Sequence, residues 1–485
     1  MTDKGMIAFI NGNILTMEKD GAEAVIIRED KIEKTGPRGI VKGMKEAQIV
    51  DLKGRFLAPG FIDSHIYFVD TGLNLAKIDL SKIRSLEDAF DITKERLEKE
   101  KKVTPLICVD FDESKWKENR LPKREELDKL GSDRAIIFRR VCGHIAVANK
   151  KALESIPEGW KKIDYNTGIL LEDVVLYINE IFPPERKEIE TAITKAQKKA
   201  YSLGITSIHD MTLKRYLDVY REMEEKDGLR IRVYAVLPVR DMDYITSWRG
   251  KWVKTGGIKL FADGSIGAKT AALKLPYPGT RTYGVLNYER EEIERIVREA
   301  DRRGFQIFIH AIGERAIEQV LDAYEKELGE NSGRHRIEHF ELADTSAIKR
   351  AKKFGVILAM QPNFIANWGK DGGLYENLLG ERGLHTNRFK TALKEGCMVC
   401  FGSDSMPPGP VYGTKGAMEH PSEGVSFYDA LRMYTINSAY AGFDEKLTGS
   451  IKEGKKADLV VLSGSPPNLK VDMTMVNGEV VYNRL

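Results

Sequence analysis

This chain of 485 residues lacks several features that would indicate other classes of protein. Its four cysteines are too few for a disulfide framework, which favours a reducing compartment. The formal net charge is only +3, with acidic and basic residues interspersed, so nothing requires nucleic acid or a membrane surface as a partner. No run of about 20 apolar residues is present, and no basic-then-apolar leader opens the chain. We therefore expect a cytoplasmic protein.

The remaining composition suits a soluble globular protein with a large core, since 42% of the residues are hydrophobic and 31% are charged. The length exceeds one ordinary domain, and no internal repeat or low-complexity segment is present.

Histidine is scarce too, with eight in the chain, but half of the histidines share one kind of position. Eight short apolar runs are interpreted as strands, and most of them end in a polar side chain. These ends are His65, His209, Lys259, His310, His339 and Asp404, with Leu237 and Gln361 at the other two. In a (β/α)8 barrel the chemistry gathers where strands end, so this placement indicates a functional site.

The two ends of the chain carry similar patterns of short strands. Met6–Met17 is predicted to form strand, Asn-Gly turn and strand, and Thr474–Tyr482 a hairpin on a second Asn-Gly turn. Further strands are predicted at Ala24–Ile27, around Ile32 and at Ala457–Leu462. We expect one small β-sandwich formed by both termini, from residues 1–58 and 440–485.

The middle of the chain alternates strand and helix patterns. Amphipathic helices are indicated, for example, by Ile293, Ile296, Val297 and Ala300 at positions i, i+3, i+4 and i+7. Buried strands are predicted between the helices, at Leu229–Leu237, from Gly257 onward, and at Phe305–His310, His335–His339, Gly355–Gln361 and Met398–Ser403. This alternation predicts a (β/α)8 TIM-like barrel over residues 59–69 and 204–439.

The first two predicted barrel strands, Phe56–Tyr67 and Gly204–Asp210, are separated by far more chain than one crossover needs. We interpret residues 70–203 as an inserted α+β subdomain after the first barrel strand. Its last helix is predicted to start at Pro183-Pro184 and to end at Gly204.

A series of motifs runs along nearly the whole chain in a specific order and spacing. The motifs are Pro59–His65, Gly143–His144 with Asn149 and Lys151–Leu153, Gly204–Asp210, Lys259–Ser265, His310–Arg315, Ile337–His339, Gln361–Pro362, Gly402–Asp404, Gly449–Lys455 and Ala457–Asp458. With these motifs the chain resembles the amidohydrolase superfamily, and within it the YtcJ-like group of metal-dependent amide hydrolases.

The resemblance implies a metal site with zinc as one or two divalent ions. His65, Lys259, His310 and His339 would be ligands from strands one, four, five and six. Asp404, after strand eight, would contact the metal and take the proton of the attacking water. Zinc favours imidazole and carboxylate ligands, whereas a lysine ammonium has no lone pair. Lys259 would therefore ligate only when deprotonated or carbamylated.

Two positions depart from the family pattern. The family usually has His-x-His after strand one, but here the sequence is His65-Ile-Tyr67. Strand alternation puts both side chains on one face, and neutral tyrosine is a poor zinc ligand, so one ion should bind more easily than two. Cys142 stands where relatives commonly carry aspartate, and Cys142 or His144 could compensate as a ligand.

Several candidates also have a purely structural interpretation. Lys259 could be an ordinary strand-end lysine, and Asp404 could cap the following helix. Asp263-Gly-Ser265 could be only a turn, although relatives place it near substrate. The candidates for substrate binding are Trp116, His144, Glu172, His209, Asp263 and Gln361. The first three lie in the inserted segment and could instead be satisfied buried groups.

Two other metal-binding patterns are rejected. Cys397 and Cys400 have CxxC spacing, but on a strand residues i and i+3 point to opposite faces. His335–His339 matches the H-x-x-E-H string of inverted zinc proteases, which requires a helix. In a strand the two histidines would lie roughly 13 Å apart.

The predicted function is hydrolysis of a C–N bond in a small amide, N-formyl or cyclic amide substrate by metal-activated water. One alternative is a degenerate barrel that binds a small molecule without hydrolysing it. Another is an esterase or deaminase that uses the same site, since pocket shape sets the substrate. A homodimer is the commonest expectation for oligomeric state.

Overall fold

The computed structural model describes residues 5–99, 105–131, 133–176 and 178–485. The chain forms two compact units, Met1–Phe68 with Gln197–Leu485, and Val69–Ala196. We describe each unit by itself. No helix in the described part of the chain combines the length and the hydropathy that a membrane crossing requires.

The first unit is built around eight parallel strands. In spatial order these are β19 (Val399–Phe401), β18 (Ile357–Met360), β17 (Arg336–His339), β16 (Gln306–Ala311), β15 (Val253–Phe261), β13 (Arg232–Pro238), β12 (Ile205–Met211) and β6 (Phe61–Ile66). The short β14 (Trp248–Arg249) pairs antiparallel with β15. The first and last strands meet, because Ser64 Oγ donates to the Phe401 carbonyl at 2.7 Å and the Asp404 amide donates to the His65 carbonyl at 2.8 Å. The predicted TIM-like barrel is therefore confirmed.

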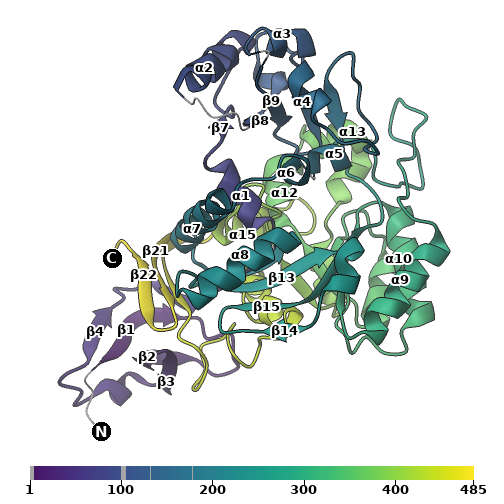
Figure 1. Ribbon diagram of the computed structural model, residues 1–485. Helices are drawn as coiled ribbons and strands as arrows, with labels where there is room; N and C mark the ends of the chain where they lie inside the picture. The colour runs from purple at the N-terminus through teal and green to yellow at the C-terminus, as the bar shows by residue number, and fades with distance from the viewer. Residues whose placement is uncertain (1–4, 100–104, 132, 177) are drawn as a thin grey trace. The chain divides into compact units, whose positions relative to one another are not determined.

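Helices follow the barrel strands in sequence. They are α8 (Lys214–Glu225), α9 (Arg290–Arg302), α10 (Glu314–Glu327), α11 (Thr345–Lys353), α12 (Pro362–Trp368), α13 (Leu374–Leu379), α14 (Phe389–Lys394), α15 (Pro410–Met418), α16 (Phe427–Tyr434) and α17 (Ile436–Ala441). Figure 1 shows α9 and α10 side by side. In α9 the side chains of Ile293, Ile296, Val297 and Ala300 are buried, as the spacing of the apolar positions predicts.

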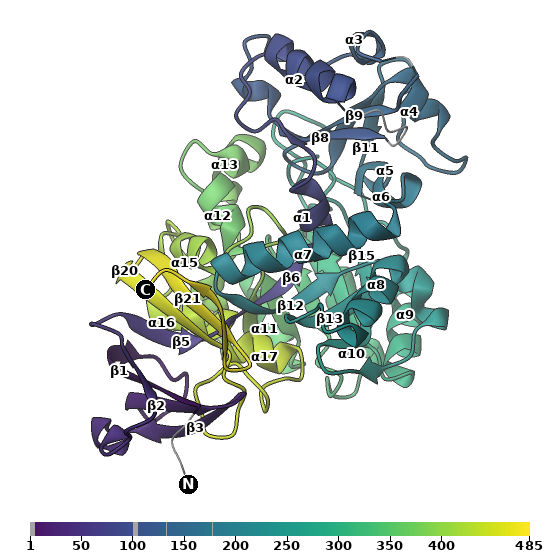
Figure 2. The same cartoon turned by 60° about the vertical axis from the view of Figure 1, so that its left-hand side comes forward.

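A second sheet in this unit joins the two ends of the chain. Its order is β22 (Glu479–Asn483), β21 (Asn468–Val476), β20 (Leu459–Ser465), β5 (Phe56–Pro59), β1 (Met6–Ile14), β2 (Ala22–Arg28) and β3 (Lys31–Gly36), with β4 (Gln48–Asp51) paired to β1. The C-terminal strand β20 pairs antiparallel with β5, so the yellow β20 and the purple β5 labelled in Figure 2 belong to one sheet. Phe9, Leu57, Val461 and Met475 are among the buried residues of its core.

Two details of the predicted strands were wrong. Asn11-Gly12 is not a turn, because β1 runs through it, with Asn11 at φ 59° and a shift of register between Ile10 and Ile14. Asparagine and glycine both accept positive φ, which suits a bulge as well as a turn. The predicted strand Phe56–Tyr67 is two strands, β5 and β6, divided at Gly60. A Cβ at Gly60 would lie 2.4 Å from the Thr206 side chain.

The second unit contains a five-stranded mixed sheet. Its order is β11 (Ile169–Leu171), β10 (Ile145–Ala148), β9 (Ile136–Arg140), β8 (Leu106–Phe111) and β7 (Ile78–Asp79). Alternate residues of β8 enter different apolar clusters, Ile107 on one face and Cys108 on the other, so both faces are buried. The remaining α-helices are α1 (Phe68–Asn74), α2 (Leu86–Lys99), α3 (Arg124–Asp128), α4 (Lys150–Glu154), α5 (Asp173–Leu176), α6 (Ile178–Ile181) and α7 (Arg186–Ser202). The first residue of α1 and the last residues of α7, from Gln197 onward, belong to the first unit.

Candidate metal centre

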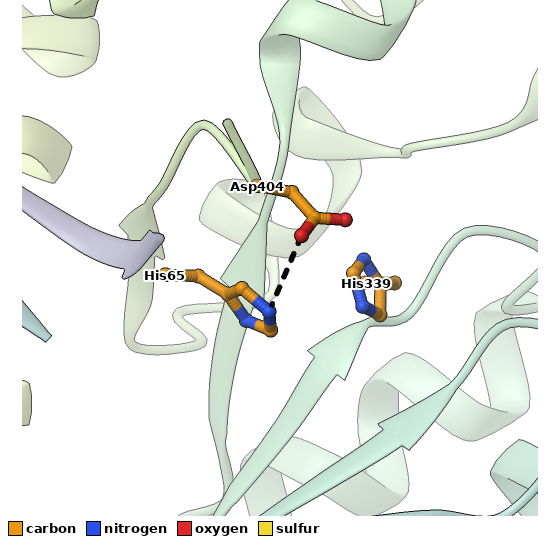
Figure 3. Close-up of side chains that lie close together, drawn as sticks. All are labelled: His65, His339 and Asp404. Carbon is orange, nitrogen blue, oxygen red and sulfur yellow. Dashed lines mark ion pairs between the residues drawn. The ribbon is translucent and has the colours of Figure 1, made fainter. Parts of the chain in front are cut away.

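Three strand-end side chains converge in the barrel. His65 lies on β6, His339 ends β17, and Asp404 lies three residues after β19. One possible ligand atom from each lies within 4.8 Å of the other two. Figure 3 shows the two imidazoles and the carboxylate facing one another, with His65 Nε2 3.7 Å from Asp404 Oδ1. Among the described residues, no other set of three or more His, Cys, Asp and Glu side chains has this geometry.

The backbone at two of these positions is unusual. His339 has φ 73° and Asp404 has φ 52°, and the residues after them, Phe340 and Ser405, have φ 52° and 62°. Positive φ is uncommon for residues other than glycine and tends to cluster at functional sites. These turns direct the side chains at the ends of β17 and β19.

The two histidines of the cluster are suited to metal binding as neutral rings. Burial is the largest cause that lowers the pKa of His65 and of His339 well below the ordinary value, and the positive charge of Lys259 acts in the same direction. A neutral imidazole has a lone pair on one nitrogen to offer to a cation. His65 Nε2 is buried and has no hydrogen-bond partner among the described residues, a costly state that a bound ion would relieve.

Lys259 and His310 flank the cluster without joining it. The Lys259 amine is buried on β15 and has no hydrogen-bond partner among the described residues. Burial lowers its pKa to about 8, although the charges of Glu338 and Asp404 oppose that shift. The His310 ring centroid lies 4.5 Å from that of His339, but His310 Nε2 lies 3.0 Å from the Gly264 carbonyl oxygen.

The metal ligand expected beside His65 is replaced by a packed side chain. Tyr67 packs against an apolar cluster in the barrel that includes Met211, Tyr234 and Phe308, and its ring centroid lies 6.1 Å from that of His65. Its aromatic ring therefore contributes to the packing of the barrel interior.

The other candidates from the sequence lie in different surroundings. His209 lies on β12, with Nδ1 2.9 Å from Arg336 Nη1. Asp263 is buried and accepts hydrogen bonds from the amides of Ala272, Ile312 and Gly313 at 2.8–3.0 Å, while burial raises its pKa to about 7. Gln361 Nε2 donates to the Ala359 carbonyl at 3.1 Å.

Four candidates, Trp116, Cys142, His144 and Glu172, belong to the second unit. His144 Nδ1 lies 2.9 Å from Glu172 Oε2, and Trp116 stacks on Phe111 with ring centroids 5.1 Å apart. Cys142 is partly exposed and carries a free thiol.

Of the residues that define the two rejected patterns, only His339 belongs to the ligand cluster found among the described residues. His335 precedes a strand rather than lying in a helix, and its Nε2 lies 3.0 Å from Asp301 Oδ1. Cys397 Sγ donates to the Ile348 carbonyl at 3.5 Å, and neither cysteine of the pair belongs to the ligand cluster.

Two buried carboxylates beside the cluster were given no role by the sequence. Asp63 accepts hydrogen bonds from Ser403 N at 2.9 Å and from Ser403 Oγ at 2.5 Å, which ties β6 to the segment after β19. Glu338 contacts His65 Nδ1 and forms an ion pair with Arg336. Both carboxylates lie inside the sequence motifs, Asp63 two residues before His65 and Glu338 one residue before His339. Their place next to candidate ligands is the feature of the sequence that could have identified them.

A nearly closed eight-stranded parallel barrel with such a cluster at its strand ends defines a metal-dependent hydrolase of the TIM-barrel class. The amidohydrolase family's sequence model matches residues 48–482, and the chain belongs to that family. The expected membership of the YtcJ-like group is confirmed. The chain is accordingly a metal-dependent hydrolase of C–N bonds other than peptide bonds.

Relatives match the chain over almost its full length. The putative amidohydrolase YtcJ of Bacillus subtilis is 29% identical over 98% of each chain. The N-substituted formamide deformylase of Arthrobacter pascens is 25% identical over 100% of this chain and 99% of its own length. The crystal structure of an uncharacterized metal-dependent hydrolase from Pyrococcus furiosus matches with a TM-score of 0.80 and 28% identity, over 96% of this chain and 100% of that one.

Proposed function

We propose that His65, His339 and Asp404 hold one divalent ion and that this ion is zinc. The proposal depends on the approach of their ligand atoms to within 4.8 Å of one another. Imidazole nitrogen and carboxylate oxygen are preferred zinc ligands, and three protein ligands with an open position are typical of catalytic sites.

Lys259 and His310 are the remaining ligand candidates. A pKa of about 8 gives Lys259 far more neutral amine at neutral pH than an ordinary lysine has. The neutral amine is the form that can ligate a metal or react with carbon dioxide to give a carbamate. His310 would have to exchange its contact with the Gly264 carbonyl for a metal bond.

One ion is favoured over two because Tyr67 occupies the position of the second strand-one histidine. Its phenol is a poor zinc ligand when neutral, and its ring is packed against apolar side chains. Cys142 or His144 is proposed as an additional ligand that compensates for the missing second histidine.

The proposed reaction is hydrolysis of an amide, N-formyl or cyclic amide substrate. A bound divalent ion supplies a Lewis acid and lowers the pKa of water. Asp404 removes the proton of the attacking water and then returns it to the leaving nitrogen. The Asp404 side chain is 19% exposed, which supports its access to water.

An N-formyl amine is the favoured substrate, because the N-substituted formamide deformylase aligns with all of this chain. The family matches do not favour the alternatives, which were binding without hydrolysis and an esterase or deaminase reaction at the same site. Trp116, His144, Glu172, His209, Asp263 and Gln361 remain our candidates for substrate contacts.

The wider organisation is also proposed. We assign residues 1–58 and 440–485 to a β-sandwich, residues 59–69 and 204–439 to the barrel, and residues 70–203 to the inserted subdomain. The strand pairing of β20 with β5 supports the first assignment. A cytoplasmic, homodimeric enzyme without nucleic-acid or membrane partners is the arrangement we propose.

The metal content of purified protein tests this proposal. We expect about one zinc per chain in the wild type and less than about a tenth of that in His65→Ala and His339→Ala. His385→Ala is the matched control, because His385 is an exposed histidine outside the cluster. Hydrolysis of an N-formyl amine should be lost with the metal. Wild-type metal content in both cluster variants would refute the site.

A further inference from the structure

A fully buried ion pair lies inside the barrel beside the ligand cluster. Arg336 and Glu338 are two residues apart on β17, so their side chains share one face of the strand. Arg336 Nε donates to Glu338 Oε1 at 2.7 Å, and Arg336 Nη2 donates to Oε2 at 2.8 Å. Both side chains have 0% exposure. A buried ion pair adds little net stability over an apolar pair, so stability alone does not account for these residues.

Neighbouring strands hold the Arg336 guanidinium on several sides. Its Nη2 also donates to the Ser64 carbonyl at 2.9 Å, and its Nη1 lies 2.9 Å from His209 Nδ1. The guanidinium carbon lies 4.1 Å from the ring centroid of Phe308. These contacts reach β6, β12 and β16, so Arg336 has little freedom to rotate. Ser64 directly precedes His65 in the sequence, so this contact lies next to the candidate ligand.

Glu338 connects this arginine to His65. Its Oε2 lies within hydrogen-bond range of His65 Nδ1. Arg336 donates to both oxygens, which leaves the carboxylate as an acceptor toward the imidazole. The hydrogen of the neutral His65 ring must then be on Nδ1. The lone pair of Nε2 is left directed toward Asp404, where Nε2 has no hydrogen-bond partner among the described residues.

We propose that Glu338 and Arg336 are positioning residues of the metal centre. Glu338 accepts the His65 Nδ1 hydrogen and thereby selects the tautomer whose Nε2 can bind a cation. Arg336 fixes the orientation of the Glu338 carboxylate. His209 belongs to the same network, as the acceptor for the third Arg336 contact. The inference rests on the proposed role of His65 as a ligand.

The direct test is the zinc affinity of Glu338→Gln. A glutamine amide directs N–H groups toward either the arginine or the imidazole, so one of the two contacts must be lost. Removing such a partner of a ligating histidine typically weakens metal affinity about 10- to 100-fold. We expect a rise in the zinc Kd of that size, measured by chelator competition, and altered visible bands of the cobalt-substituted protein. Glu338→Asp, which keeps the charge, should recover part of the affinity.

Asp458→Asn is the matched control. Asp458 forms another buried ion pair, in which Arg232 Nε donates to its Oδ2 at 2.8 Å, with side-chain exposures of 7% and 1%. This variant loses a buried ion pair outside the ligand cluster, so it should lower stability and leave the zinc Kd unchanged. If Glu338→Gln does not fold, Arg336→Lys is the second variant. A lysine cannot make all four of the arginine's hydrogen bonds at once. We therefore expect the zinc affinity of Arg336→Lys to lie between that of the wild type and that of Glu338→Gln.

The outcomes separate this inference from the proposed function. If His65→Ala loses zinc while folded Glu338→Gln, or Arg336→Lys in its place, keeps the wild-type Kd and cobalt spectrum, the positioning role is refuted and the metal site stands. If His65→Ala itself keeps zinc, the proposed site fails. If Glu338→Gln and Asp458→Asn lost zinc affinity equally, general destabilisation would explain the loss, and the inference would be overturned.

Discussion

Substituting one glycine by alanine should displace His65, which we propose as a metal ligand. Gly402 follows β19 directly and lies against β6 where that strand carries His65. A Cβ at position 402 would lie 2.4 Å from the His65 backbone nitrogen, 2.6 Å from its Cβ and 2.8 Å from its Cα. Ordinary contact begins at 3.4 Å, so the nearest approach is too short by 1.0 Å. Two of these atoms are backbone atoms, which cannot rotate away.

The displacement of His65 sets the size of the effect on metal binding and on catalysis. Metal–ligand distances tolerate about 0.2 Å, and a displacement of about 1 Å at a reacting group can cost about 100-fold in rate. We expect Gly402→Ala to raise the zinc Kd at least about 10-fold and to lower kcat/KM about 100-fold. Crowding of the barrel should also lower the free energy of unfolding by about 1–3 kcal/mol.

Chelator competition, steady-state kinetics and denaturant unfolding of the metal-free protein measure these three effects. Gly329→Ala is the control, because its Cβ would meet no atom within 4 Å and its φ is not in the positive range. If Gly402→Ala bound zinc and hydrolysed substrate as Gly329→Ala does, the geometric argument about His65 would be wrong.

Three further predictions concern other parts of the molecule. Asp404→Asn should lower kcat at least about 100-fold, since the amide cannot accept the water proton, and near-full activity would exclude that role. Burial lowers the pKa of Lys77, which lines a cavity of about 610 Å³ in the second unit, to about 7. About half of the Lys77 side chains should therefore carry the reactive neutral amine at pH 7, against about 0.03% for an ordinary lysine. This neutral fraction, and the acetylation that depends on it, should level off at higher pH. Competitive acetylation with mass spectrometry checks this, and labelling of Lys77 that rises only near pH 10 would contradict it. Asp458→Asn should lower the free energy of unfolding by about 3–5 kcal/mol in denaturant titrations, because Arg232 is left buried without its carboxylate; a change below about 1 kcal/mol would contradict this.

Much of the barrel could be predicted because its signals are local. The apolar spacing of Ile293, Ile296 and Val297 depends only on the helical period, and all three side chains are buried in α9. The turn at Asn477-Gly478 was predicted correctly, and both residues have positive φ, 48° and 77°. The same dipeptide at Asn11-Gly12 was misassigned, because a preference for positive φ does not distinguish a bulge from a hairpin.

The sequence by itself determined which residues were available to the site. Parallel strands bring their carboxyl ends to one edge, so His65, His339 and Asp404 could be nominated from the ends of apolar runs. Only the tertiary structure decided which candidates converge, and it directs His310 Nε2 to the Gly264 carbonyl oxygen.

The partners of the ligands also depended on the tertiary structure. Glu338 meets His65 across 273 residues of sequence, and Arg336 meets His209 across 127. Periodicity and turn propensity act over a few residues, whereas these contacts depend on the order and register of the strands around the barrel. The sequence therefore determined the candidate ligands, and the packing of the barrel determined their orientation.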